Sequence, residues 1–257
     1  MEDAENPIKS RHKIKQLTME TKNFFYIAMT IAISVGLTGC LKAPEIDSGT
    51  IADVQWVFEF ETSTLTFSGT GEILGGNQTF ESSYSKYSNL TKHVIIKEGI
   101  TGIGSSAFLH FGIESVSIPN SVENIRSEAF QWCYKLHSVS IPDGVKRIEN
   151  SAFYMCSGLS ILTIGDGVTS IGSMAFQDCV SLFSLKIGKS VTNIGSHAFN
   201  GCQALNAVTC FAVTPPKREY LSFERPDIID LYVPAKSVSA YKEHPDWKDF
   251  RSISAIQ

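Results

Sequence analysis

Four cysteines of this chain recur at a fixed interval of 23 residues, at Cys133, Cys156, Cys179 and Cys202. Thiolates are good zinc ligands, but zinc sites are usually built around a local pair of ligands, which this spacing lacks. If the interval reflects stacked coils, neighbouring thiols come within the distance that a disulfide allows. Stacked side chains point in the same direction, however, so we expect buried free thiols that act as small apolar residues. Disulfides remain the alternative, because exported thiols are exposed to oxidation.

The other side chains that could support catalysis are scattered along the chain. No two of the six histidines have the i, i+4 spacing of a helical metal site, and no nucleophile motif accompanies them. Gly102-Ile-Gly104-Ser-Ser-Ala107 fits a loose dinucleotide-binding pattern, but single glycines recur at the same positions as Gly172 and Gly195. An internal repeat explains them better than a cofactor does. The sequence therefore predicts no catalytic residue, no metal ligand and no cofactor.

One cysteine near the N-terminus stands in a different context. Residues 23–41 carry no charge and follow five basic residues, which is the order of an export signal. The run includes Leu37-Thr38-Gly39-Cys40, which resembles the bacterial lipobox, in which the cysteine receives a diacylglycerol before cleavage. We therefore predict a lipoprotein signal peptide over residues 1–40, with Cys40 as the lipid attachment site and Met19 as an alternative start. An uncleaved membrane helix is the competing interpretation, since a span needs ~20 apolar residues.

The residues after Cys40 bear on where such an anchor would lie. Leu41 takes the place of the aspartate that resembles an inner-membrane retention signal in many Gram-negative bacteria, so we expect the outer membrane. Residues 42–45 lack the acidic pair linked to surface display in some groups, which leaves surface exposure open.

The charge and composition of the chain indicate which classes of partner to expect. The net charge is −4, and the chain beyond residue 39 holds 17 basic and 22 acidic side chains. Nucleic-acid binders normally carry a basic surplus, so we expect no nucleic acid. With 43% hydrophobic and 19% charged residues, the chain has enough apolar material for a core, which excludes a disordered protein.

A period of 22 or 23 residues organises the middle of the chain. Alanine precedes each of five phenylalanines at this period, namely Phe108, Phe130, Phe153, Phe176 and Phe199. Isoleucine, valine, cysteine and leucine form further columns in step with them, one of which is Ile103, Ile125, Ile148, Ile171 and Ile194. Such columns indicate a solenoid, because one coil cannot bury its apolar face alone.

The repeating unit is clearest over residues 141–163. It reads Ile-Pro-x-Gly-Val-x-x-Ile-x-x-x-Ala-Phe-x-x-Cys-x-x-Leu-x-x-Val-x, with Leu162 in the final Val column. This pattern resembles the BspA-like (Treponema pallidum-type) leucine-rich repeat and covers residues 96–209 as five units, the first one residue short. The resemblance implies a leucine-rich-repeat solenoid, a β-rich fold of short parallel strands stacked coil on coil. Members of the family are mostly bacterial cell-surface proteins, and some resemble adhesins.

The segments on either side depart from the repeat and predict caps that cover the open coils. Residues 54–60 and 64–67 predict a β-hairpin, followed by a polar loop over 75–90. Residues 230–234 predict another strand and residues 237–242 a short helix, with Trp247 and Phe250 packed on it. The predicted domains are a signal peptide over 1–40, a linker and small β-rich N-terminal cap over 41–95, five repeats over 96–209, and an α/β C-terminal cap over 210–257.

Two outward surfaces of the repeats are candidate binding sites. The strand face is mostly serine, threonine and asparagine; its large apolar residues, Ile161 and Phe183, lie on adjacent strands, flanked by His137 and Lys186. The second candidate is the loop edge that follows each Ala-Phe pair, which carries Trp132, Tyr134, Tyr154 and Met155. Binding hot spots favour Trp and Tyr, although these aromatics can instead fold back over the cysteine column. We prefer the strand face, because a parallel ladder holds side chains in register while loops can move.

These features favour a lipid-anchored cell-envelope module for binding or adhesion, with a protein or glycan partner. A hydrolase, or the accessory subunit of a glycan-uptake system, is the alternative, and a structural envelope protein without a specific ligand is a third. Glycoside hydrolysis needs two carboxylates about 5–9.5 Å apart. The strand face offers one carboxylate, Glu114, among its outward positions, so we predict that the chain is not an enzyme.

Overall fold

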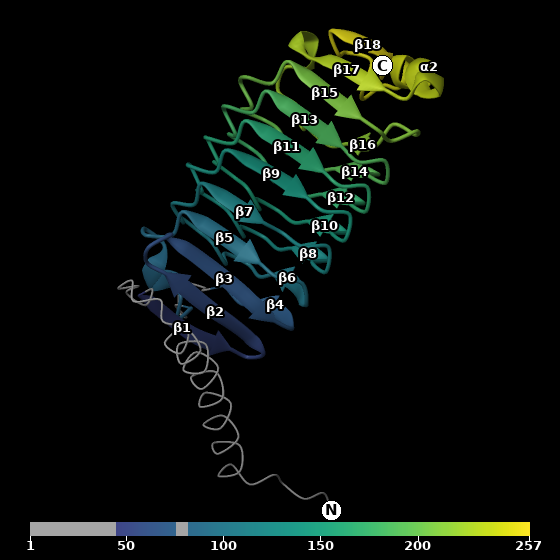
Figure 1. The fold of residues 1–257 in the computed structure, drawn as a ribbon. Helices are drawn as coiled ribbons and strands as arrows, with labels where there is room; N and C mark the ends of the chain where they lie inside the picture. The colour runs from purple at the N-terminus through teal and green to yellow at the C-terminus, as the bar shows by residue number, and fades with distance from the viewer. Residues whose placement is uncertain (1–44, 76–81) are drawn as a thin grey trace, which may run out of the picture. The chain divides into compact units, whose positions relative to one another are not determined.

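The computed structural model describes residues 45–75 and 82–257, so the predicted signal peptide, with Cys40, lies outside the described residues. In the repeat region, each turn of the chain contributes a longer strand, a strand of about two residues and an Ala-Phe segment. These turns stack in register between two caps (Figure 1). The predicted fold class, a β-rich leucine-rich-repeat solenoid with a β-rich N-terminal cap and an α/β C-terminal cap, is confirmed.

The longer strands form parallel ladders (Figure 1). Ile161 pairs with Ser138 of the preceding coil and with Ser184 of the next. Leu162 and Ile164 point inward and are buried, so the period of two in each coil builds one continuous apolar wall. The strands of this ladder are β9 (Ser138–Ile141), β11 (Ile161–Ile164), β13 (Ser184–Ile187), β15 (Ala207–Cys210), β17 (Asp230–Val233) and β18 (Ser252–Ala255).

The N-terminal cap extends the first coils as an antiparallel sheet. The predicted hairpin is present as β2 and β3, and β3 pairs in parallel with the first repeat strand. One strand that the sequence did not reveal, β1, pairs with the outer edge of β2. The sheet contains β1 (Ile46–Ile51), β2 (Val54–Glu59), β3 (Thr64–Gly69), β5 (His93–Ile96) and β7 (Ser115–Ser117).

The prediction of a polar loop over residues 75–90 is wrong for the described part of that segment, which contains buried aromatic residues. Residues 85–87 form a 3₁₀ turn, and Tyr84 and Tyr87 are buried. The Tyr84 hydroxyl shares its single proton between the carbonyl oxygens of Leu74, at 3.0 Å, and Ala107, at 3.2 Å, and the Tyr87 ring stacks on Phe58 with centroids 4.2 Å apart. The two rings cover the first coil, which would otherwise expose its apolar end; the surrounding Ser and Asn residues concealed that role in the sequence.

A second parallel ladder runs along another side of the coils and is built from shorter strands. Its inward column is isoleucine in five of the repeat coils and ends at Arg218, whose guanidinium lies over the rings of Phe223, Trp247 and Phe250. The strands are β4 (Gly71–Ile73), β6 (Ile100–Ile103), β8 (Asn124–Ile125), β10 (Arg147–Ile148), β12 (Ser170–Ile171), β14 (Asn193–Ile194) and β16 (Lys217–Arg218).

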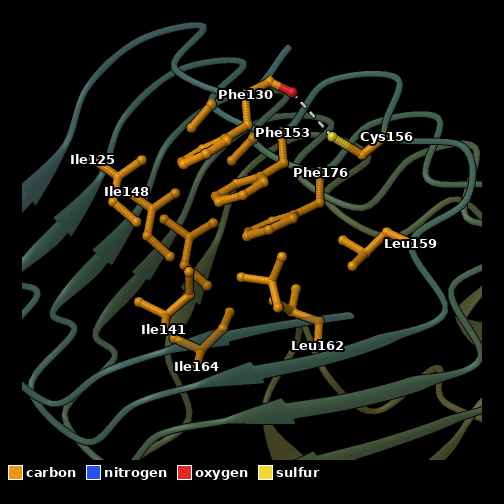
Figure 2. Close-up of a cluster of buried hydrophobic side chains, with 14 of the residues drawn as sticks. Ile125, Phe130, Ile141, Ile148, Phe153, Cys156, Leu159, Leu162, Ile164 and Phe176 are labelled. Atoms are coloured by element: carbon orange, nitrogen blue, oxygen red, sulfur yellow. Dashed lines mark hydrogen bonds between the residues drawn. The ribbon is translucent and has the colours of Figure 1, made fainter. Parts of the chain in front are cut away.

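The Ala-Phe segments form a third ladder that is not a strand. The amide of Phe130 donates to the carbonyl of Ala152 in the next coil at 2.7 Å, and Phe153 repeats this bond to Ala175. The buried rings stack nearly parallel, with the centroids of Phe130 and Phe153 4.9 Å apart and those of Phe153 and Phe176 5.1 Å apart (Figure 2). All three sides of a coil are therefore hydrogen-bonded to the neighbouring coils.

The C-terminal cap closes the last coil. Strands β17 and β18 continue the longer ladder, and the helix α2 (Val238–Glu243) places Tyr241 against Trp247 with ring centroids 5.2 Å apart. Trp247 donates its indole N–H to the carbonyl of Pro216 at 2.7 Å. Short 3₁₀ turns at Pro226–Ile228 and Ala235–Ser237 complete the cap. Within the residues that the structure describes, no helix is long and apolar enough to cross a membrane.

Gly144 and Gly167 lie in the turns that follow the strands β9 and β11. Neither Gly144 nor Gly167 has a positive φ. A Cβ at Gly167 would instead overlap the carbonyl oxygen of Asp143, and one at Gly144 that of Asn120. These positions are glycine because successive coils approach too closely for a side chain, and not because the turn needs unusual dihedral angles.

This close approach leads to a prediction. Gly167→Ala should destabilise the fold by about 1–3 kcal/mol or more, because the added methyl forces two hydrogen-bonded coils apart. Gly112→Ala is the matched control, since a Cβ there meets only the Ser88 carbonyl, at 3.7 Å. Urea denaturation of both variants measures the difference; equal midpoints would show that coil spacing does not select glycine at residue 167.

Candidate functional site

The strand face carries the four residues preferred from the sequence, in three neighbouring rows. His137, Ser160 and Phe183 form the first row, because the amide of Ser160 donates to His137 at 2.9 Å and that of Phe183 to Ser160 at 3.1 Å. Ile161 lies in the second row, and Lys186 pairs with Thr163 in the third. Ile161 and Phe183 are therefore diagonal neighbours on adjacent coils and not directly opposite each other.

Two of these side chains are large, apolar and about half exposed. Ile161 is 45% exposed and Phe183 is 49% exposed, while the residues inward of them, Leu162 and Leu185, are buried. The other outward positions of β9, β11 and β15 are mainly small or hydroxyl-bearing, such as Ser138, Ser140 and Thr209. Between β9 and β15 the face is thus a polar, rigid sheet with one apolar spot, whereas Ile95 of β5 is 40% exposed nearer the N-terminal cap.

The loop edge is also exposed. Trp132 is 38% exposed and Tyr134 53%, whereas Tyr154 and Met155 are half-buried. The Trp132 ring packs perpendicular to Tyr154, with centroids 6.4 Å apart, and also contacts His110 at 5.1 Å. The aromatic residues therefore form a row across three coils and are not folded entirely over the cysteine column.

The backbone of the loop edge is more ordered than the sequence implied. The amide of Trp132 donates to the carbonyl of Tyr154 at 2.9 Å, and that of Met155 to Gln177 at 2.9 Å. Trp132 and Met155 adopt left-handed backbone conformations, with φ of 66° and 57°. These bonds belong to the third ladder, so greater mobility is no longer a reason to prefer the strand face.

The columnar cysteines are buried and free, as expected, and so is Cys210. The sequence did not reveal that each of the four thiols also makes a hydrogen bond. The thiol of Cys156 donates to the carbonyl of Phe130 in the preceding coil, with sulfur and oxygen 3.1 Å apart (Figure 2). Burial raises the pKa of Cys156 to about 12, so the thiol keeps its proton at neutral pH and remains a donor. The other bonds join Cys133 to Phe108, Cys179 to Phe153 and Cys202 to Phe176.

The remaining motifs have structural explanations. The amide of Gly104, from the dinucleotide-like pattern, donates to the carbonyl of Ile73 at 2.8 Å within the shorter-strand ladder. Among the described residues, no three His, Cys, Asp or Glu side chains are grouped so that they could hold a metal ion.

Comparison with known proteins agrees with this architecture. The family model for the BspA type leucine rich repeat region matches residues 77–213 in six copies. No curated protein matches the chain.

Several solved structures are similar to the chain in fold. The leucine-rich repeat protein TpLRR of T. pallidum is 20% identical, covering 81% of this chain and 86% of that chain, with a TM-score of 0.49. A leucine-rich cell surface protein of Faecalibacterium prausnitzii is 20% identical over 83% of this chain and 73% of that chain, with a TM-score of 0.39. The pneumococcal vaccine antigen PcpA is 18% identical over 82% of this chain and 48% of that chain, with a TM-score of 0.44.

The family model spans more than half of the chain, and its repeat is the one seen in the columns and in the stacked coils. This chain belongs to the BspA-type leucine-rich-repeat family.

Proposed function

We propose that this chain is a lipid-anchored binding module of the cell envelope, attached through Cys40 to the outer membrane, which holds a protein partner on its strand face. The family and its solenoid fold indicate a protein-binding scaffold in general terms. The observation that carries the more specific proposal is the pair of large apolar side chains, Ile161 and Phe183, exposed on an otherwise polar ladder.

The strand face meets two requirements of a binding surface, order and desolvation, the first of which it shares with the loop edge. A parallel ladder bonded to coils on both sides is already in its bound conformation, so association loses little conformational entropy. An apolar anchor surrounded by groups that exclude water is the usual composition of a binding hot spot. His137 and Lys186, on either side of the apolar spot, add hydrogen-bonding and charged groups at its rim.

The loop edge is the competing surface, and packing decides against it. The Trp132 ring is already in contact with His110 on one side and Tyr154 on the other. Among the described residues, the Phe183 ring has no aromatic neighbour. Phe183 is 49% exposed and Trp132 38%, so a partner can cover a larger fraction of the phenylalanine.

Catalysis receives less support than binding. Between Glu114 and Thr209, the outward positions of the strand face include one carboxylate, whereas glycoside hydrolysis uses a pair about 5–9.5 Å apart. BspA-type solenoids are typically binding scaffolds, which makes the hydrolase interpretation the weaker proposal.

A pair of double substitutions tests the choice of surface. Ile161→Ser with Phe183→Ser should reduce binding to a partner from a panel of purified extracellular-matrix proteins by at least tenfold, since two apolar anchors are lost. Trp132→Ser with Tyr154→Ser, the matched control, should bind within threefold of the unmodified chain. Surface plasmon resonance gives the affinities, and thermal melting of both variants verifies folding. Loss of binding in the loop-edge pair alone, at unchanged melting temperature, would move the site to that edge.

A further inference from the structure

A hollow of about 310 Å³ lies on the shorter-strand ladder, away from both surfaces considered so far. Gly172 and Gly195 form part of its floor, and Glu149 and Glu219 lie at its two ends along the stack of coils. Arg147, Ser170 and Asn193, on the outward side of the strands β10, β12 and β14, also line it. Its volume is at the lower end of the about 300–1,000 Å³ typical of ligand sites.

The sequence builds the hollow from one column of the repeat. Glu149, Gly172, Gly195 and Glu219 occupy equivalent positions in four successive coils. A Cβ at Gly172 would lie 2.6 Å from the backbone carbon of Glu149, and one at Gly195 would lie 2.5 Å from the amide nitrogen of Ser173. The two middle coils therefore have only backbone at this position, at Gly172 and Gly195, whereas the coils before and after them carry a glutamate side chain.

The hydrogen-bonding groups around the hollow are partly unused. Within the described residues, the side chains of Arg147, Ser170 and Asn193 make no hydrogen bond or ion pair. Glu149 accepts from the amide and hydroxyl of Ser127 at 3.1 and 3.2 Å, and Glu219 accepts from the hydroxyl of Ser196 at 3.3 Å. The carboxylates are thereby oriented. The second oxygen of Glu149, Oε1, lies 3.7 Å from a guanidinium nitrogen of Arg126, and Oε1 of Glu219 keeps its capacity to accept.

We propose that this hollow binds a neutral saccharide. Its lining holds donors on Arg147, Ser170 and Asn193 and acceptors on Glu149 and Glu219, which suits a ring whose hydroxyls both donate and accept. A small anion would be repelled by Glu149 and Glu219, and a small cation by Arg147. The bare backbone of Gly172 and Gly195 lets a flat ligand lie close to the floor.

An exposed aromatic residue stands next to one end of the hollow. Tyr220, the residue after Glu219, is 73% exposed, and its ring contacts His197 edge-on with centroids 5.5 Å apart. Tyr220 does not line the hollow itself, so its ring would meet the apolar ring face of a saccharide that extends past Glu219.

The test measures saccharide binding by the full chain in a detergent without a sugar headgroup. The probes are neutral tetrasaccharides of glucose, xylose, mannose and N-acetylglucosamine, with tetragalacturonate as an acidic counterpart. We expect at least one neutral probe to bind with a millimolar or lower Kd by isothermal titration, and tetragalacturonate to bind at least tenfold more weakly. Absence of binding by every neutral probe, or preference for the acidic one, would overturn the proposal.

Variants locate the binding. Asn193→Trp fills the hollow and should abolish binding, while Arg147→Ala removes one charged donor and should weaken it about tenfold. Ser138→Trp, on the strand face, is the matched control and should leave the Kd unchanged. If Asn193→Trp lowers the melting temperature, Asn193→Ala replaces it, with several-fold weaker binding expected. Unchanged affinity in a folded Asn193 variant would refute the site.

The saccharide site stands apart from the proposed protein-binding function. The double substitution Ile161→Ser with Phe183→Ser should leave saccharide binding unchanged. If instead that variant loses the saccharide, the hollow is not the site, whatever the strand face binds.

Discussion

Phe153→Ala should destabilise the protein by about 3–5 kcal/mol. The ring of Phe153 is fully buried and stacked between those of Phe130 and Phe176, at centroid distances of 4.9 and 5.1 Å. The amide of Phe153 and the carbonyl of Ala152 are also bonded to the adjoining coils, so the backbone cannot collapse into the space that the ring leaves. Urea denaturation followed by tryptophan fluorescence measures the loss.

Two further variants define what this result means. Ile148→Ala, in the inward column of the shorter strands, should cost about 2–5 kcal/mol, because it also leaves a cavity between fixed coils. Ser138→Ala, on the outward side of β9, should change stability by no more than about 0.5 kcal/mol. Equal urea midpoints for Phe153→Ala and Ser138→Ala would mean that the inward and outward residues of the coil have been assigned the wrong way round.

The inward residues could be read from the sequence because burial here is repeated. One inward phenylalanine is weak evidence, but the recurrence of Ala-Phe from Phe108 to Phe199 in step with isoleucine and leucine leaves a single consistent arrangement. The core residues of a solenoid can therefore be predicted from its period, because every coil buries side chains at the same positions of the repeat.

The third ladder, formed by the Ala-Phe segments, could not be predicted from the sequence. Its left-handed backbone conformations occur at residue types that rarely adopt them. Positive φ normally indicates glycine, yet the residue two places after each phenylalanine is His110, Trp132, Met155 or Asp178, and only Gly201 in the last coil. Inter-coil hydrogen bonds hold these residues in the left-handed region, which costs roughly 1–2 kcal/mol per residue. Tertiary contacts overrode local preference at these positions.

One of the two candidate sites could be predicted from the sequence and the other could not. The residues of the strand face were found because Ile161 and Phe183 interrupt a polar pattern. The saccharide hollow escaped notice because Gly172 and Gly195 are explained equally well by close packing. A site formed by the absence of side chains gives no signal of its own in one sequence.

Cys40→Ala should abolish lipid attachment, if the cysteine at the end of Leu37-Thr38-Gly39-Cys40 is the acceptor. Only the thiol can form the thioether to diacylglycerol, so the variant should remain a full-length precursor and take up no fatty-acid label in growing cells. Lys42→Ala, outside the lipobox-like sequence, is the control and should be labelled and processed normally.

The same variant separates anchoring from folding. Cys40 precedes the first described strand, β1, whereas the other five cysteines are buried in the solenoid with high thiol pKa values. Burial and protonation protect those five thiols from acylation, so Cys40 is the one cysteine whose loss should remove the label. The melting temperature of Cys40→Ala should equal that of the unmodified chain, because the stacked coils and their two caps are built from residues 45–75 and 82–257. Fatty-acid labelling that persists in Cys40→Ala would refute Cys40 as the attachment site, whereas an unmodified chain that is membrane-bound and takes up no label would favour the uncleaved membrane helix.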